Sequence, residues 1–296
     1  MQISANGIAI EVEDHGPASA EPLLLIMGLG MQLTGWPDGF VGQLVRRGFR
    51  VIRFDNRDAG LSHAFDELGV PHVALASMQY LLHWPIKSAY GLADMARDAL
   101  GVLDALGIAR AHVCGASMGG MIAQHLAFDH AARVRSLALM MTSSGARSLP
   151  QPSMKLRGAL ISRPENPSDF DSIVAHNMMI NQLIASPGYP TPEPQLRQRI
   201  ESYVRRSNRP QGLARQLVAI VADGSRAERL AGIAAPTQVI HGQADPLVAP
   251  QAGQQLARLI PSARLDLIDG MGHDLPEALW PRFVAAIHDN ARRAAS

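Results

Sequence analysis

Short apolar runs rich in β-branched residues alternate with longer amphipathic segments along most of the chain. Runs of roughly four to eight apolar residues are typical of buried strands, and apolar residues three or four positions apart are typical of helices. Seven runs predict strands: Ile8–Val12, Leu23–Met27, Arg50–Phe54, Ala111–Cys114, Val134–Met141, Thr237–His241 and Arg264–Ile268. Five segments predict helices: Gly39–Arg47, Tyr90–Leu106, Met118–Asp129, Pro250–Leu259 and Pro276–Ala291. This alternation implies an α/β fold with a mostly parallel central sheet flanked by helices.

The alternation stops over residues 143–229. Prolines are frequent there and divide apolar helical patterns such as Phe170–Ile184 and Leu213–Val221, while no run resembles a strand. We therefore expect residues 1–142 and 230–296 to form the α/β core, and residues 143–229 to form a helical cap inserted between two strands.

Composition and charge describe a globular protein without a strong electrostatic field. Of the 296 residues, 47% are hydrophobic and 18% are charged, so a large core can be buried. The 27 basic residues balance 26 acidic residues to a net charge of +1, which favours neither nucleic acid nor an anionic membrane as a partner. The basic pair Arg205–Arg206 is interpreted as a solvated helix face. We therefore expect a small-molecule ligand.

Three further features bear on the compartment. Cys114 is the only cysteine, so no intramolecular disulfide can form. Residues 1–16 lack the basic start and apolar run that are typical of a secretory signal. The early apolar stretch Leu23–Met31 is too short to span a bilayer and is interrupted by glycines. These observations predict a cytoplasmic protein.

The segment Gly115-Ala116-Ser117-Met118-Gly119 matches the pattern G-x-S-x-G. A predicted strand ends directly before it and a predicted helix begins directly after it, so the chain must turn sharply at Ser117. Glycines remove the β-carbons that would clash across such a turn, and we expect strained backbone at the serine. The turn would present Ser117 as a nucleophile at the carboxyl edge of the sheet. The alternative is a glycine-rich turn whose serine caps the helix.

A serine hydroxyl reacts only when a base removes its proton, so this hypothesis requires a histidine and an orienting acid on later loops. The predicted strand Thr237–His241 leads to Asp245, and the predicted strand Arg264–Ile268 leads to His273. Both follow Ser117 in the order serine, acid, histidine that this arrangement requires. The sequence therefore predicts Ser117, Asp245 and His273 as a catalytic triad. The predicted helix Pro276–Ala291 follows His273, and its first residue, Pro276, suits the first turn of a helix.

The acid has one competitor in the sequence. Asp269 lies four positions before His273 and could orient it, or could cap the turn that presents it. Asp245 is preferred because it lies on the loop after the preceding strand. The other histidines, including His125 and His241, have no metal-ligand spacing, so no metal site is expected.

With these residues the chain resembles the α/β-hydrolase superfamily over nearly its whole length, and within it the methylesterases of the aclacinomycin type. The resemblance is carried by Met27-Gly28, Gly35-Trp36-Pro37-Asp38, Arg53–Ser62, His112–Gly119 and Gly270-Met271-Gly272-His273. It implies a cap over the site, no cofactor, and a structural role for the charged segment Asp55–Ser62.

The resemblance also implies that the backbone N–H groups of Leu29 and Met118 form an oxyanion hole. Many relatives carry His-Gly where this chain has Met27-Gly28, which removes a side-chain hydrogen bond but leaves the main-chain donor in place. Five residues are expected to line the substrate pocket: Trp36, Met121, Met178, Met179 and Leu183. The alternative for the three cap residues is that they only pack the cap to itself.

The sequence therefore predicts a serine hydrolase that cleaves a carboxylic ester of a small-to-medium apolar substrate through an acyl-enzyme. A perhydrolase or a C–C bond hydrolase uses the same triad and stays an alternative. A non-catalytic receptor is a third possibility, although a pure binder needs no correctly ordered acid and base. The serine at position 117 argues against epoxide hydrolases and haloalkane dehalogenases of this fold, which carry an aspartate there.

Overall fold

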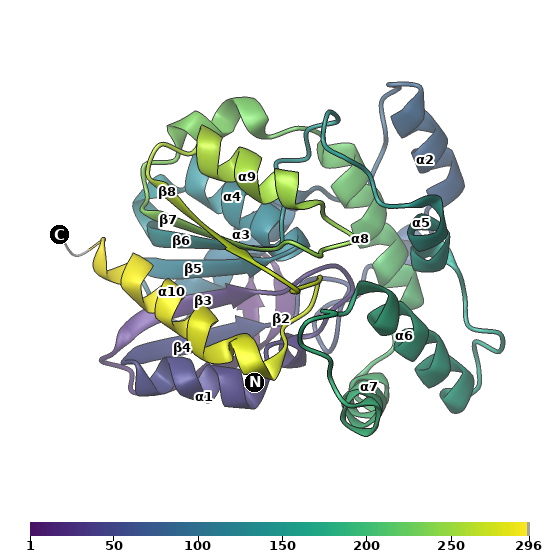
Figure 1. Cartoon of the computed structure of the whole chain (residues 1–296), viewed down its shortest axis with the longest axis horizontal. Coiled ribbons are helices and arrows are strands. Elements are labelled where there is room, and N and C mark those ends of the chain that lie inside the picture. Colours follow the sequence, from purple (N-terminus) through teal and green to yellow (C-terminus); the bar gives the residue numbers. More distant parts are fainter. Residues whose placement is uncertain (295–296) are drawn as a thin grey trace.

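A computed structural model describes residues 1–294, in which a single eight-stranded sheet lies between two layers of helices (Figure 1). Its strands are β1 (Gln2–Ala5), β2 (Ile8–His15), β3 (Glu21–Ile26), β4 (Phe49–Phe54), β5 (Ala111–Ala116), β6 (Val134–Met140), β7 (Thr237–Gly242) and β8 (Ala263–Ile268). They are ordered β1-β2-β4-β3-β5-β6-β7-β8. Only the pairs β1–β2 and β2–β4 are antiparallel. The predicted mostly parallel sheet is confirmed.

Strand β1 is absent from the sequence-based prediction. It pairs with β2 through a two-residue turn, in which Asn6 and Gly7 have φ of 49° and 79°. An Asn-Gly pair with positive φ at both positions is the strongest short signal for a β-hairpin. This signal was present in the sequence, and it would have identified the strand.

Helices α1 (Asp38–Arg46) and α10 (Trp280–Arg292) cover one face of the sheet, while α3 (Leu92–Ala105), α4 (Met118–Asp129) and α9 (Pro250–Leu259) cover the other (Figure 1). The last helix begins at Trp280, since Glu277–Leu279 form a separate 3₁₀ turn. Its first-turn proline is therefore Pro281, which corrects the expected start at Pro276. Within residues 1–294 no helix has both the length and the apolarity to cross a membrane.

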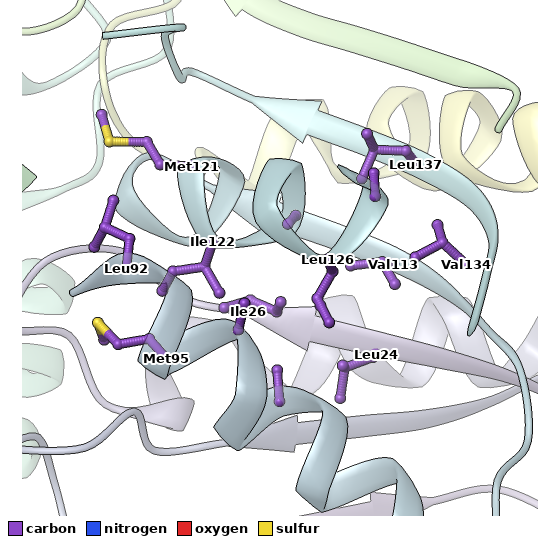
Figure 2. Packing of buried hydrophobic residues seen from close by; sticks show 14 of the residues in the cluster. Leu24, Ile26, Leu92, Met95, Val113, Met121, Ile122, Leu126, Val134 and Leu137 are labelled. Carbon is purple, nitrogen blue, oxygen red and sulfur yellow. The ribbon is translucent and has the colours of Figure 1, made fainter. Parts of the chain in front are cut away.

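Strand β3 shows why the central strands are apolar throughout. Its residues alternate between two apolar clusters, with Leu24 and Ile26 on the α3–α4 side and Leu23 and Leu25 on the α1–α10 side. Figure 2 shows the first cluster, where Leu24 and Ile26 lie close to α4. Burying one such side chain contributes about 1.5 to 3 kcal/mol to folding. A strand covered on both faces therefore reads as a continuous apolar run.

Between β6 and β7 the chain forms four α-helices, followed by a 3₁₀ helix (Ala227–Gly232), and within the described residues no strand. The four α-helices are α5 (Met154–Ile161), α6 (Phe170–Ile184), α7 (Glu193–Arg206) and α8 (Pro210–Asp223), called the cap helices below. Figure 1 shows them gathered beyond one end of the sheet, together with α2 (Val73–Leu81). The chain enters them from the carboxyl end of β6, so they lie at the edge to which the parallel strands point.

The charged segment after β4 has the structural role that the resemblance implied. Asp55, which is fully buried, accepts hydrogen bonds from the N–H groups of Leu33 at 2.6 Å and Leu61 at 2.8 Å, and pairs with Arg206 of α7 at 2.8 Å. The Arg206 side chain is only 19% exposed. The interpretation of Arg205–Arg206 as a solvated face is therefore wrong for Arg206, because that guanidinium reaches the core.

A second buried ion pair joins the same segment to α8. Arg215 contacts both carboxylate oxygens of Asp58 at 2.8 Å, and both side chains are at most 1% exposed. Burial alone would raise the pKa of Asp58, but hydrogen bonds from Arg215 and Tyr90 hold it below its usual value. Because Arg215 lies on α8 and Asp58 follows β4, this buried pair ties the cap helices to the core.

A buried histidine on β5 makes stability depend on pH. His112 is 1% exposed, and burial lowers its pKa to about 4 from an ordinary 6.5. Between these values the unfolded chain binds more protons than the folded chain, so stability falls as the pH drops below 6.5. Urea titrations at pH 7 and pH 5 should give a loss of about 2 kcal/mol that His112→Gln removes. An equal loss in the variant would contradict this assignment.

Candidate active site

The backbone at Ser117, between β5 and α4, is strained. Its φ is 54° and its ψ is −120°, a combination that residues with a side chain rarely adopt. The Ser117 N–H donates to the carbonyl of Met140 at 3.0 Å, and its carbonyl accepts from the Thr142 hydroxyl at 2.7 Å. These contacts with β6 and the residues after it hold the sharp turn that was expected from the sequence.

The two glycines of the motif are required by close backbone approach. A β-carbon at Gly115 would lie 2.2 Å from the carbonyl oxygen of Gly119, and one at Gly119 would lie 2.0 Å from that of Ile26. Real side chains do not tolerate such distances. Helix α4 can therefore start directly against the sheet only with glycine at both positions.

The Ser117 side chain does not cap the helix that follows it. Its Oγ instead lies 3.0 Å from Nε2 of His273, whose Nδ1 lies 2.7 Å from Oδ2 of Asp245. The three residues follow β5, β8 and β7, so the carboxyl ends of three strands bring them together. Asp269 is exposed and forms no hydrogen bond or ion pair with His273 within residues 1–294, so of the two candidate acids it is Asp245 that contacts the histidine.

Asp245 is held by several donors. Its Oδ1 accepts from the N–H groups of Leu247 at 2.9 Å and Val248 at 2.8 Å, and Nε2 of His241 lies 3.5 Å from its Oδ2. Burial would raise the pKa of Asp245, but the charge of His273 and these hydrogen bonds hold it well below its usual range. The Asp245 carboxyl group is therefore ionised in the folded protein at neutral pH. Sequence reasoning treated His241 as structural and missed its place beside Asp245.

The cap helices position the loop that carries His273. The His273 N–H donates to the carbonyl of Ile184, at the end of α6, at 2.8 Å. The Gly272 N–H donates at 2.8 Å to the hydroxyl of Ser186, which in turn bonds Asp274. No sequence pattern pointed to these contacts, because they join residues about ninety positions apart.

The segment after β3 runs beside the serine. A β-carbon at Gly28 would lie 3.2 Å from Cβ of Ser117. Within residues 1–294 neither the N–H of Leu29 nor that of Met118 donates to an acceptor, whereas the N–H of Gly30 is taken up by Gln216 at 2.7 Å. Both N–H groups that were expected to form an oxyanion hole are thus without an acceptor in the described residues.

The Met27-Gly28 pair, which departs from the His-Gly pattern, is held by a side chain from the core. The side-chain amide of Asn56 donates to the carbonyl of Met27 at 2.9 Å. This bond holds the start of the loop on the core.

A family model for the alpha/beta hydrolase fold matches residues 21–277. The chain belongs to this family. It is 28% identical to rhodomycin D methylesterase DauP from Streptomyces sp. (strain C5), over 99% of this chain and 98% of that protein. It is 29% identical to a 2-hydroxy-6-oxononadienedioate/2-hydroxy-6-oxononatrienedioate hydrolase from Cupriavidus pinatubonensis, over 89% of this chain and 84% of that protein. The predicted resemblance to esterases of the α/β-hydrolase family is confirmed.

Solved structures show the same architecture. A meta-cleavage product hydrolase from Pseudomonas fluorescens superposes with a TM-score of 0.77 at 20% identity, over 99% of this chain and 98% of that one. At this identity the similarity concerns the fold alone. By its sequence relatives, the chain is an α/β-hydrolase similar to a methylesterase and to a 2-hydroxy-6-oxononadienedioate/2-hydroxy-6-oxononatrienedioate hydrolase.

The five pocket candidates of this α/β-hydrolase fall in different places. Trp36 is fully buried and stacks on Phe40 in the core, so it has no surface to offer a substrate, and that expectation is wrong. Met178 packs the cap to itself, in a cluster between α6 and α7. Met121 is 9% exposed and packs against the α3–α4 cluster. Met179 is 37% exposed and Leu183 is half-buried, and both stay predictions.

The remaining candidates for chemistry have structural surroundings. Cys114 is fully buried next to the sulfur of Met140, and burial raises the pKa of its thiol, which keeps it protonated. His125 pairs with Asp223 of α8 at 2.8 Å. No group of three or more His, Cys, Asp or Glu side chains within residues 1–294 is arranged to hold a metal ion.

The strain at Ser117 can be measured without any activity assay. Both Ser117→Ala and Ser117→Gly remove the hydroxyl, but only glycine relieves the positive φ. We expect the glycine variant to be more stable than the alanine variant by about 1 kcal/mol. This difference is the relief of backbone strain minus the cost of the extra entropy that glycine gives the unfolded chain. Urea unfolding of the two variants gives this difference. An alanine variant of equal or higher stability would show that the turn is unstrained.

Proposed function

We propose that this hydrolase cleaves carboxylic esters of small-to-medium apolar molecules through an acyl-enzyme on Ser117. The observation that carries the proposal is the continuous set of contacts from the Ser117 hydroxyl through His273 to the buried Asp245. The available N–H groups of Leu29 and Met118 lie on the loop and the helix that flank this serine.

Acylation follows from this geometry. Nε2 of His273 removes the Ser117 proton as Oγ attacks the ester carbonyl, while Asp245 holds the Nδ1 proton and stabilises the imidazolium. The oxyanion that forms accepts hydrogen bonds from Leu29 and Met118. One such donor lowers the barrier by about 3 to 4 kcal/mol, because it is oriented before charge develops.

Acylation ends when the C–O bond to the alcohol breaks and the His273 imidazolium gives its proton to the departing alcohol, which leaves the acyl-enzyme. Deacylation then uses the same residues. Water then takes the place of the alcohol, and neutral His273 removes its proton as it attacks the acyl-enzyme carbonyl. Collapse of the second tetrahedral intermediate returns the proton to Ser117 and releases the acid. An ionised Asp245 supports both steps.

The relatives favour an ester as the substrate, and one observation favours a second candidate. The 28% identity to a methylesterase extends over nearly the whole of both chains. The 29% identity to a 2-hydroxy-6-oxononadienedioate hydrolase covers somewhat less of each chain and favours C–C bond cleavage with the same triad. Rates on a panel of p-nitrophenyl and methyl esters, measured beside a 2-hydroxy-6-oxo-dienoate, separate the two reactions.

Removing the nucleophile should abolish hydrolysis. We expect Ser117→Ala to lower turnover of p-nitrophenyl esters by roughly 10⁴- to 10⁶-fold, because the covalent route is lost. A fluorophosphonate should label the wild type at Ser117 alone, as read by peptide mass spectrometry. Near-normal turnover in the variant, or labelling at another residue, would mean that Ser117 is not the nucleophile.

The acid is tested against its neighbour in sequence. Asp245→Asn should lower kcat by roughly 10⁴-fold near neutral pH, because an amide favours the wrong tautomer of His273. The matched control is Asp269→Asn, which makes the same chemical change on an exposed side chain and should leave kcat within about threefold. Steady-state kinetics at pH 7 compares them, and a reversed ranking would refute the assignment.

A further inference from the structure

The loop that carries Leu29 is anchored by two different parts of the chain. This loop, residues 27–33, is called the oxyanion loop below. The core holds its two ends, since Asn56 bonds the carbonyl of Met27 at 2.9 Å and Asp55 accepts from the N–H of Leu33 at 2.6 Å. Its middle extends beyond β3 toward the cap helices, where a β-carbon at Gly30 would lie 2.5 Å from Cδ1 of Leu213 of α8.

Both main-chain groups of Gly30 are bound by the cap helices. Its N–H donates to Oε1 of Gln216, on α8, at 2.7 Å. Its carbonyl accepts from the hydroxyl of Tyr203, on α7. Burial raises the pKa of Tyr203 to about 12, so this hydroxyl stays protonated and donates. The peptide units on either side of Gly30, directly after Leu29, are therefore oriented by the cap.

Gln216 also forms a hydrogen bond with the core. It is fully buried, and its Nε2 donates to the carbonyl of Arg57 at 2.7 Å while its Oε1 accepts from Gly30. One neutral amide thus satisfies a buried N–H and a buried C=O together. A hydrocarbon side chain of the same size would leave both groups unpaired, at about 1 to 3 kcal/mol each.

We propose that Gln216, assisted by Tyr203, is a positioning residue that orients the Leu29 N–H for the oxyanion, so that the cap completes the catalytic site as well as covering it. The inference rests on the proposed function. It follows from the geometry of one turn, in which the carbonyl of Gly28 accepts from the N–H of Met31 at 3.2 Å. With the Leu29–Gly30 peptide of this turn held at its N–H by Gln216, rotation of the preceding Gly28–Leu29 peptide away from Ser117 is restricted.

Such a role has a kinetic signature. The bond from Leu29 to the oxyanion exists in the transition state and not in the bound ester, so misorienting it lowers kcat and leaves KM nearly unchanged. A substrate-contacting residue of the cap would instead change KM together with ester preference. A residue that only stabilises the fold would change the unfolding midpoint and leave both kinetic parameters unchanged.

The test compares two buried glutamines. Gln216→Met removes the amide with little change in volume, and Gln124→Met makes the same change on α4. Gln124 is also fully buried, with two hydrogen bonds, to the carbonyl of Ser143 at 3.1 Å and from Arg226 at 3.0 Å, but it does not contact the oxyanion loop. For each variant, kcat and KM on a p-nitrophenyl ester are measured with the inhibition constant of a trifluoromethyl ketone, which forms an oxyanion adduct with serine.

We expect Gln216→Met to lower kcat by about 10- to 100-fold and to leave KM within about threefold of the wild type. The inhibition constant of the trifluoromethyl ketone should rise by a factor similar to the loss in kcat. Gln124→Met should leave all three within about threefold. Equal losses in the two variants, or an unchanged kcat in Gln216→Met, would overturn the inference.

A second variant decides the matter if Gln216→Met does not fold. Tyr203→Phe removes only the hydroxyl that binds the carbonyl of Gly30. It should lower kcat by about 3- to 10-fold at constant KM, and an unchanged kcat would overturn the inference. If the wild type neither hydrolyses esters nor is labelled by a fluorophosphonate, the proposed function fails and the inference with it. An active wild type with unaffected variants refutes the inference alone.

Discussion

The sharp turn at Ser117 is the constraint on which the remaining structure of the site depends. A left-handed backbone at a residue with a side chain costs on the order of 1 to 3 kcal/mol, so it persists only where the surroundings impose it. Here β5 is fully buried between β3 and β6, and α4 starts against β3 at a distance that only Gly115 and Gly119 allow. The packing of the sheet therefore maintains the strained backbone at Ser117, and this conformation places the Ser117 hydroxyl at the carboxyl edge of the sheet.

The other residues of the site are positioned beside Ser117 by both the core and the cap helices. The core contributes Asp245 and His273 at the ends of neighbouring strands, whereas the cap helices hold the loop of His273 and the middle of the oxyanion loop. The buried ion pair Asp58–Arg215 connects the core to the cap helices, so the two parts keep the same relative position. Removing the charge of Arg215 would leave the buried Asp58 with only the neutral donors Tyr90 and Phe65, at a cost of about 3 to 5 kcal/mol. The pair therefore favours one position of the cap helices on the core.

Particular residues show how far sequence reasoning reached. Ser117, Asp245 and His273 could be placed because each follows an apolar run, and parallel strands bring their carboxyl ends to one edge. The hairpin at Asn6-Gly7 carried a local signal that was overlooked. Trp36 was misassigned because sequence cannot tell whether an aromatic side chain faces a pocket or the core, and its burial against Phe40 decides for the core.

By itself the sequence determined the alternation of strands and helices, the insertion that interrupts it, and the order of the three residues at the sheet edge. These are consequences of periodicity and chain order, which are local properties. Only the tertiary structure decided that Arg206 and Arg215 turn inward to buried carboxylates and that Gln216 and Tyr203 hold Gly30. Such contacts join segments more than 140 positions apart through directional hydrogen bonds. Their partners are defined by the docking of α7 and α8 on the core, which no local pattern encodes.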